Sequence, residues 1–315
     1  MNRLRVLVCG TNYGRSYVTA LSRLPDTFEL AGILARGSTR SRQVAAANGV
    51  PLYVDVRDVE KNIQLACAAM NSSAWPVVIK LLKRSIHVLC EHPQRSAALK
   101  GGISIASRHK IKFHLNGHFV DLPASRRFAA ECSRLRKTAA PIFVQALATE
   151  RSLYGLLDIL KTSLGSVELS QIEFEREKGF CMVSGGLGRL PLNLLVQISG
   201  TKRGGHLPDG SPKYLFDYRV TVGFPDGVLT LMSMSGPVVW NPAPAKKGDR
   251  QWVTLYDGTT TREDLREQRI EANMSALESI CRAILRGHSP ERQRPIHILE
   301  VSQAWESIAR KLYAA

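Results

Sequence analysis

A glycine-containing turn near the N-terminus has the spacing of a phosphate-binding site. The apolar run 4–9 ends in Gly10-Thr11-Asn12-Tyr13-Gly14-Arg15, and apolar residues at helical spacing follow over 16–24. Backbone N–H groups of such a turn, with the positive end of the helix, can approach a pyrophosphate where glycine leaves room. The turn departs from G-x-G-x-x-G, because Asn12 takes the second glycine position and Arg15 the third. The pattern also fits a tight turn without a ligand.

A basic segment follows the predicted second strand, residues 28–35. It contains Arg36, Gly37, Ser38 and Arg40, and residues 36–42 include no Asp or Glu. A unit that binds NAD usually places an acidic side chain here for the ribose 2′-hydroxyl, whereas arginine and hydroxyl donors suit the 2′-phosphate of NADP. The segment therefore predicts NADPH. The alternative is a basic, solvated start of a helix.

Glu91-His92-Pro93 closes another predicted strand, 86–90, and carries a side chain suited to proton transfer. Histidine has an ordinary pKa of about 6.5, so its imidazole can give up a proton near neutral pH. We therefore take His92 as the candidate general acid. The alternative is an imidazole that only hydrogen-bonds a cofactor or a strand end.

These motifs belong to an alternating series of strands and helices. Further segments of the series are predicted over residues 65–70, 75–83, 96–100 and 112–116. The alternation predicts an α/β fold with a doubly wound parallel sheet, helices on both faces and a ligand crevice at the carboxyl ends of the strands. We place this Rossmann domain at residues 1–118. Asn71 and Ser72, which cap the helix after the third strand, are expected beside the cofactor.

The pattern changes after Phe119. Helices are predicted over 124–135, 153–164, 262–285 and 298–312, strands over 167–178, 214–224, 228–234 and 252–256, and loops over 200–212 and 241–248. Strands in succession without long helices between them predict an α+β domain with an open, mostly antiparallel sheet. This second domain is placed at residues 119–315, with a last helix that could pack back on the first domain.

The charge of the chain is strongly positive. Its 43 Lys and Arg against 27 Asp and Glu give a net charge of +16, which attracts polyanions. No nucleic-acid-binding motif is present, so nucleic acid is not the expected partner. No run reaches the roughly 18 apolar residues of a membrane span, and the N-terminus does not resemble a secretory signal.

The cysteines and histidines do not form a metal-binding pattern. The six cysteines are scattered without a C-x-x-C pair, which predicts reduced thiols in a cytoplasmic protein. The one close pair of histidines, His114 and His118, flanks Gly117 in an extended stretch. Because a structural zinc needs clustered soft ligands, no metal is expected.

The glycine turn, the basic strand end and Glu91-His92-Pro93, in this order, resemble the Gfo/Idh/MocA oxidoreductases. Members of that family usually carry Glu-Lys-Pro, whose lysine assists proton transfer beside the nicotinamide. His92 in place of the lysine, with the stretches 35–38 and 116–119, is similar to the thiazolinyl imine reductase branch, which acts in siderophore assembly of the pyochelin and yersiniabactin type. The resemblance is diffuse in the C-terminal part.

This resemblance implies that NADPH reduces the C=N bond of a thiazoline to a thiazolidine. The substrate would be tethered to the carrier domain of a nonribosomal peptide synthetase, and such carriers are typically acidic, which suits a charge of +16. Sugar-oxidising relatives often follow a Gly-Gly motif with an aspartate and a histidine, and residues 185–197 contain neither. By analogy with the family, we expect a homodimer.

One position departs from that branch and leaves the proton donor open. The branch has a tyrosine, proposed as the donor, where Phe119 stands in this chain. Phenylalanine cannot donate a proton, so His92, His118, Tyr154 or bound water would supply it. Two other functions also remain: an NADP-dependent oxidoreductase acting on a sugar or ketone, and a non-catalytic NADPH-binding regulator.

Overall fold

A computed structural model of the protein describes residues 3–70, 75–198, 214–243, 252–258 and 261–313. The chain divides into two compact units. Unit 1 comprises residues 1–118 and 266–299, and unit 2 comprises residues 119–265 and 300–315. Residues 266–299, which follow the predicted domain boundary in sequence, thus belong to the same unit as the N-terminal strands.

Unit 1 contains a six-stranded parallel sheet in the order β3-β2-β1-β4-β5-β6. Its strands are β1 (Leu4–Cys9), β2 (Phe28–Leu34), β3 (Leu52–Tyr53), β4 (Leu65–Ala68), β5 (His87–Glu91) and β6 (Phe113–Asn116). Every residue of β4 and β6 is buried. Strands covered on both faces tend to be apolar rather than alternating, and this holds for β4 (LACA), whereas β6 (FHLN) also carries the buried polar residues His114 and Asn116.

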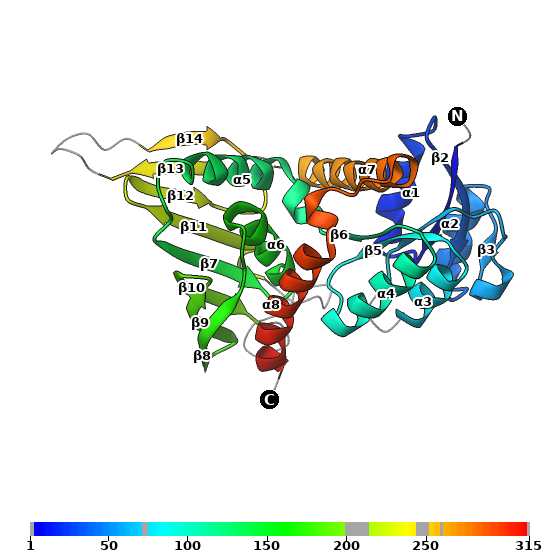
Figure 1. Cartoon of the computed structure of the whole chain (residues 1–315). Helices are drawn as coiled ribbons and strands as arrows, with labels where there is room; N and C mark the ends of the chain where they lie inside the picture. The colour runs from blue at the N-terminus through cyan, green and yellow to red at the C-terminus, as the bar shows by residue number, and fades with distance from the viewer. Residues whose placement is uncertain (1–2, 71–74, 199–213, 244–251, 259–260, 314–315) are drawn as a thin grey trace. The chain divides into compact units, whose positions relative to one another are not determined.

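Helices cover both faces of this sheet (Figure 1). They are α1 (Gly14–Ser22), α2 (Thr39–Ala47), α3 (Trp75–Lys83), α4 (Ser96–Arg108) and the greater part of α7 (Arg262–Arg286), with short turns η1 (Val56–Asp58) and η4 (Glu291–Gln293). One core cluster joins Val6 and Val8 of β1 to Leu21 of α1 and to Ile270 and Leu277 of α7. Helix α7, although it comes late in the chain, therefore completes the core around the N-terminal sheet.

Unit 2 contains an eight-stranded sheet in the order β14-β13-β12-β11-β7-β10-β9-β8. Its strands are β7 (Phe143–Thr149), β8 (Leu169–Glu177), β9 (Phe180–Leu187), β10 (Leu190–Gln197), β11 (Tyr218–Phe224), β12 (Gly227–Leu231), β13 (Val238–Pro242) and β14 (Val253–Tyr256). Only the pair β7–β10 is parallel. Helices α5 (Pro123–Leu135) and α6 (Leu153–Leu164) pack against each other and on this sheet, after the turn η3 (His118–Asp121). Helix α8 (Pro295–Tyr313) begins in unit 1 and continues in unit 2.

The predicted fold class is confirmed, with a parallel Rossmann sheet and a second, mostly antiparallel sheet. The sequence did not predict β9 and β10, because Gly185, Gly186 and Pro191 read as strand breakers. Gly185 lies at φ +150° opposite an irregularity in β8, where a Cβ would approach the carbonyl oxygen of Gln171 to 2.7 Å. The glycine therefore serves a bulge inside the sheet rather than ending the strand. Strand β13 was also missed, since Asn241 and Pro242 were assigned to a loop.

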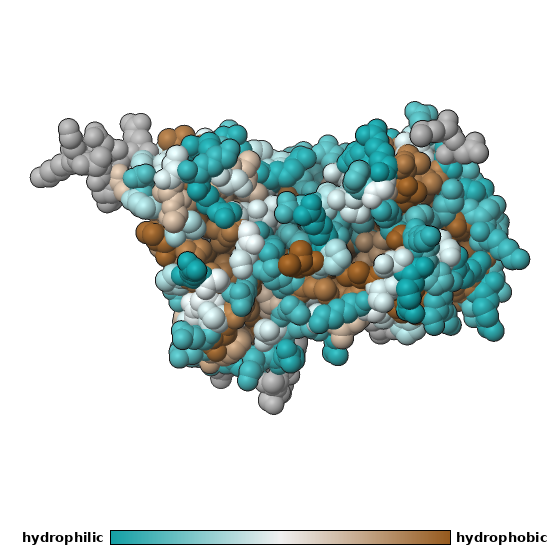
Figure 2. Space-filling model, viewed as in Figure 1, coloured by the Kyte–Doolittle hydropathy of each residue, from teal (hydrophilic) through white to brown (hydrophobic). Residues whose placement is uncertain are grey.

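The described helices include none that is long and apolar enough to cross a membrane. The face drawn in Figure 2 is mostly hydrophilic, with scattered hydrophobic areas. All six cysteines are buried and unpaired. A cytoplasmic location stays a prediction.

Candidate active site

The candidate site of unit 1 lies at the carboxyl ends of its central strands. Glu91 is the last residue of β5 and Asn116 the last of β6, and the two are direct partners in the parallel ladder. Tyr13 follows β1 and precedes α1, and His118 begins η3. Because parallel strands end at one edge of the sheet, residues far apart in sequence meet here.

The carboxyl group of Glu91 is buried and held by two donors. Its Oε1 accepts hydrogen bonds from the hydroxyl of Tyr17 and from Nδ2 of Asn116, the latter at 2.9 Å. Burial raises the pKa of Glu91 to about 8, against the two hydrogen bonds, which lower it. Glu91 is therefore mainly a neutral carboxylic acid at pH 7.

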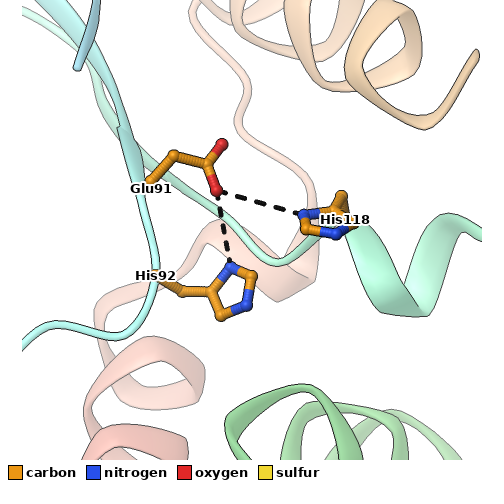
Figure 3. A group of neighbouring side chains, drawn as sticks. All are labelled: Glu91, His92 and His118. Carbon is orange, nitrogen blue, oxygen red and sulfur yellow. Dashed lines mark ion pairs between the residues drawn. The ribbon is translucent and has the colours of Figure 1, made fainter. Parts of the chain in front are cut away.

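Two histidines lie beside the other oxygen of Glu91. Oε2 is 3.8 Å from Nδ1 of His92 and 4.0 Å from Nδ1 of His118, as Figure 3 shows. The imidazole rings are 5.3 Å apart, and their side chains are only 5% and 7% exposed. Burial lowers the pKa of His118 well below its ordinary value, and the neighbouring His92 and Arg269 lower it further. With a neutral Glu91, these contacts are not full ion pairs at neutral pH.

The tautomer of His92 follows from its backbone partner. Nδ1 of His92 lies 2.6 Å from the carbonyl oxygen of Asn116. A carbonyl oxygen only accepts, so Nδ1 carries a hydrogen and donates it. In the neutral ring Nε2 is then an acceptor, whereas in the protonated ring Nε2 holds the proton that can be transferred. Any proton that this ring exchanges with a ligand would therefore pass through Nε2.

A second set of contacts surrounds His118. The hydroxyl of Tyr13 is 3.2 Å from Nδ1 of His118, and the two rings stack with centroids 5.5 Å apart and planes at 24°. Tyr13 also contacts Asn273 of α7, whose Oδ1 accepts from Nδ2 of Asn116 at 2.8 Å. Helix α7 therefore contributes a buried polar side chain to the site.

Glu91, His92 and His118 also form a group that could hold a metal ion, with ligand atoms within 4.8 Å of one another. Nδ1 of each histidine has a partner in the protein, the carbonyl oxygen of Asn116 for His92 and the hydroxyl of Tyr13 for His118. Binding a metal ion through Nδ1 would require these contacts to break. The sequence did not reveal this grouping, and the absence of a metal stays a prediction.

The predicted phosphate-binding turn joins β1 to α1. Gly10 has φ +91°, and a Cβ there would lie 2.5 Å from the carbonyl oxygen of Ala69, so only glycine fits. Thr11 is buried, Asn12 and Arg15 are exposed, and α1 begins at Gly14 rather than at the predicted Ser16. No side chain caps this helix and its first turn has no acidic residue, which leaves its positive end available to an anion.

The predicted basic segment joins β2 to α2. Arg36, Ser38 and Arg40 are exposed, and Ser38 caps α2 by accepting from the backbone N–H of Ser41 at 3.3 Å. Gly37 has φ +75° and its carbonyl oxygen accepts from the guanidinium of Arg42 at 3.0 Å. The guanidinium of Arg42 is thus held by the backbone, and Arg36 and Arg40 are the other two arginines of this segment.

Five further residues were considered from the sequence, and the structure describes three of them. Pro93 continues the chain from His92 toward α4, and Asn71 and Ser72 lie outside the described residues. Tyr154 is in unit 2, 3% exposed, with its ring edge-on to Trp305 at 6.4 Å. Phe119, also in unit 2, has its ring edge-on to Tyr218 at 6.0 Å, which is the environment of a packed aromatic side chain. The role of Tyr154 stays a prediction.

Tyr17 and Asn273 belong to this polar network but were not predicted from the sequence as site residues. Tyr17 stands four residues after Tyr13 on α1, a spacing that places both on one helix face. Asn273 lies among Ile270, Leu277 and Ile280, which recur at core spacing along α7, and it is fully buried. An asparagine on the apolar face of a helix is itself a signal of a buried polar network.

Comparisons with known proteins agree with this fold. Residues 4–116 match the Gfo/Idh/MocA family model, described as an oxidoreductase family with an NAD-binding Rossmann fold. No curated protein sequence matches the chain. The similar solved structures are less than 25% identical in sequence to this chain, so they bear on the fold alone.

GenD2 from gentamicin A biosynthesis, in complex with NAD, superposes with a TM-score of 0.75 at 14% identity, covering 100% of this chain and 95% of its own. An oxidoreductase from Thermotoga maritima gives 0.74 at 12% identity, covering 99% and 97%. UDP-N-acetylglucosamine 3-dehydrogenase from Acidithiobacillus ferrooxidans gives 0.70 at 14% identity, covering 98% and 97%. Residues 4–116 of this chain are therefore similar to the NAD-binding Rossmann domain that the Gfo/Idh/MocA family model describes, and the whole chain shares the fold of these solved structures.

Proposed function

We propose that the protein is an NADPH-dependent reductase that converts the C=N bond of a thiazoline to a thiazolidine on a carrier-tethered siderophore intermediate. The observation that carries the proposal is the buried pair His92 and His118 at the carboxyl ends of β5 and β6. Reduction of an imine needs a proton for the nitrogen, and histidine is suited to supply one near neutral pH.

Features of unit 1 fit a dinucleotide. The uncapped start of α1 suits the pyrophosphate, and exposed Arg36, Ser38 and Arg40 suit a 2′-phosphate. Oδ1 of Asn116 and Oε1 of Gln94 are buried acceptors with no hydrogen-bond partner among the described residues. Buried acceptors are normally satisfied, so they fit a bound group that brings its own donors. When bound, NADPH would supply the hydride to the imine carbon.

The protein's own residues handle the proton. Protonated His92 gives the proton at Nε2 to the substrate nitrogen, and the ring becomes neutral with its Nδ1 hydrogen still on the carbonyl of Asn116. That hydrogen bond fixes the orientation of the ring through the transfer. Glu91, held by Tyr17 and Asn116, places a carboxyl group beside His92 without adding a full negative charge.

The substrate class is supported by what residues 185–197 lack. They form the end of β9 and β10, and they contain no Asp or His for sugar hydroxyls. Leu192 and Leu194 of β10 are buried in unit 2. A site for polyols needs polar side chains that pair with the substrate hydroxyls, because binding is weakened strongly when a buried polar group has no hydrogen-bond partner.

A carrier domain is the proposed partner because the chain has a net charge of +16 and carriers are typically acidic. Added salt should lower kcat/KM for a carrier-tethered thiazoline, since screening weakens steering between oppositely charged proteins. A free thiazoline thioester of the same structure is the control, with a flat salt response. Equal responses of both substrates would remove the steering argument.

A second candidate is an NAD(P)-dependent sugar dehydrogenase. It is favoured by solved structures with the same fold, among them UDP-N-acetylglucosamine 3-dehydrogenase from Acidithiobacillus ferrooxidans. Phe119, which cannot donate a proton, would favour a third candidate, a non-catalytic NADPH-binding regulator.

The test follows NADPH absorbance with a synthetic thiazoline thioester, and NADPH formation from NADP⁺ with a panel of polyols and nucleotide sugars. The proposal expects turnover of the thioester and none of the sugars. Turnover of a sugar alone identifies the second candidate. Tight NADPH binding with no turnover of any substrate identifies the third.

A further inference from the structure

The two histidines of the site differ in the atoms that contact Nδ1. His92 faces a backbone carbonyl, which only accepts, so its Nδ1 carries the hydrogen. His118 faces the hydroxyl of Tyr13, which can either donate or accept. The tautomer of His118 therefore depends on where the hydroxyl hydrogen of Tyr13 points.

A chain of amide groups sets the direction of that hydroxyl. Nδ2 of Asn116 lies 2.6 Å from the hydroxyl of Tyr17, 2.9 Å from Oε1 of Glu91 and 2.8 Å from Oδ1 of Asn273, and its bond to Oδ1 sets how the Asn273 amide is turned. Nδ2 of Asn273 then lies 3.3 Å from the hydroxyl oxygen of Tyr13 and donates to it. Tyr13 is left to donate its own hydrogen to Nδ1 of His118, at 3.2 Å. In this arrangement Asn273 and Tyr13 each receive one hydrogen bond and pass one on.

The opposite direction is less favourable. It would have Tyr13 donate to Oδ1 of Asn273 at 3.4 Å, the longest of these contacts. The same oxygen already accepts the shorter bond from Asn116, and Nδ2 of Asn273 would lose Tyr13 as an acceptor. Hydrogen bonds that polarise one another in a buried chain favour the first direction.

We propose that Tyr13 and Asn273 are positioning residues that hold His118 in the tautomer with its hydrogen on Nε2. His118 and His92 then have opposite tautomers, so that one offers a donor at Nε2 and the other, when neutral, an acceptor. In the reduction proposed above, on which this consequence rests, Nε2–H of His118 offers a neutral hydrogen bond to an acceptor of the substrate other than the imine nitrogen, whose single lone pair takes the proton from His92. The tautomer itself does not depend on the identity of the substrate.

The test is ¹⁵N NMR of histidine-labelled protein at neutral pH, which distinguishes a ring nitrogen that carries hydrogen from one that does not. The His118 signals are identified by their loss in His118→Asn. We expect Nδ1 of His118 to be unprotonated in the wild-type protein and Nδ1 of His92 to be protonated. A wild-type His118 with hydrogen on Nδ1 would overturn the proposal.

Two variants test the role of the chain. Tyr13→Phe keeps the ring that stacks on His118 and removes only the hydroxyl, and Asn273→Asp replaces the donor with an acceptor. In both, we expect His118 to shift toward hydrogen on Nδ1, where Oε2 of Glu91 lies 4.0 Å away. Tyr53→Phe on β3, whose hydroxyl interacts with Glu60 instead, is the matched control and leaves His118 unchanged. No shift in Tyr13→Phe would also overturn the proposal.

Activity provides a separate readout. With a thiazoline substrate, Tyr13→Phe should lower kcat by roughly 10-fold, less than the roughly 10²- to 10⁴-fold effect of removing a general acid, with little change in KM. If the tautomer shifts but no thiazoline is ever reduced, the tautomer assignment stands and the proposed function fails. If the tautomer shifts and kcat for an active enzyme is unchanged, the catalytic consequence is wrong.

Discussion

Glu91 is the residue whose burial has the clearest consequence for stability. Its carboxyl group is held by Tyr17 and Asn116 in a site that raises its pKa to about 8 from a model-compound value of 4.5. The folded protein thus binds a proton that the unfolded chain has released above about pH 5. The free energy of unfolding should therefore fall as pH rises through the folded-state pKa.

The variant Glu91→Gln tests this linkage, because glutamine keeps the shape of the neutral acid but cannot ionise. Between about pH 6.5 and pH 9, the wild-type protein should lose roughly 2 kcal/mol more stability than the variant. His118, whose pKa is lowered, changes charge below this window and does not contribute to the difference. Urea unfolding at several pH values measures it, and parallel curves for the two proteins would contradict the raised pKa.

His92 is the residue to which the proposal assigns the proton. In His92→Gln, an amide replaces the imidazole, and kcat for thiazoline reduction should fall by about 10²- to 10⁴-fold, the usual contribution of a general acid. NADPH affinity, measured by fluorescence titration, should change little. If NADPH binding is lost while the residual kcat at saturation is unchanged, His92 only holds the cofactor.

At the scale of elements, the parallel sheet was predictable because most of its strands are mainly apolar runs that alternate with segments of helical spacing. The meeting of Glu91 with Asn116 follows from the same sheet, since both residues end neighbouring strands. The sequence could not place Asn273, because a residue near the end of the chain joins this site only through the packing of α7 on β1. Likewise, β9 and β10 escaped prediction because their glycines and proline normally mark loops.

The segment between β2 and α2 supports a prediction about cofactor choice. Replacing Arg36 and Arg40 together by alanine removes two exposed cations to which the proposal assigns the 2′-phosphate. The affinity for NADPH should fall by at least about 10-fold and that for NADH should change little, because charged hydrogen bonds contribute roughly 1.5–3 kcal/mol each. Arg108→Ala, at the end of α4, is the control. Equal losses for both cofactors, or none, would argue against NADPH preference.

At the scale of the whole molecule, unit 1 is discontinuous in sequence. Ile270, Leu277 and Ile280 of α7 belong to the same buried cluster as β1 and α1. Burying three such side chains contributes about 5–9 kcal/mol, which is comparable to the stability of a whole domain. The Rossmann fold of this chain therefore depends on residues beyond position 118.

A fragment of residues 1–118 should accordingly lack a cooperative unfolding transition and bind NADPH poorly. Joining residues 266–299 to it through a flexible linker should restore both properties. Circular dichroism during urea unfolding, with NADPH titration, measures the effect. A fragment 1–118 as stable as the full chain would show that α7 is not needed for this core.

The most direct test of the proposed reaction is the transfer of hydrogen from cofactor to substrate. The protein is incubated with a thiazoline thioester and NADPH deuterated at the transferable position of the nicotinamide, and the product is analysed by mass spectrometry. The account predicts a thiazolidine that carries a deuterium at the former imine carbon. Recovery of the unreduced thiazoline while a nucleotide sugar exchanges hydrogen with the cofactor would contradict it.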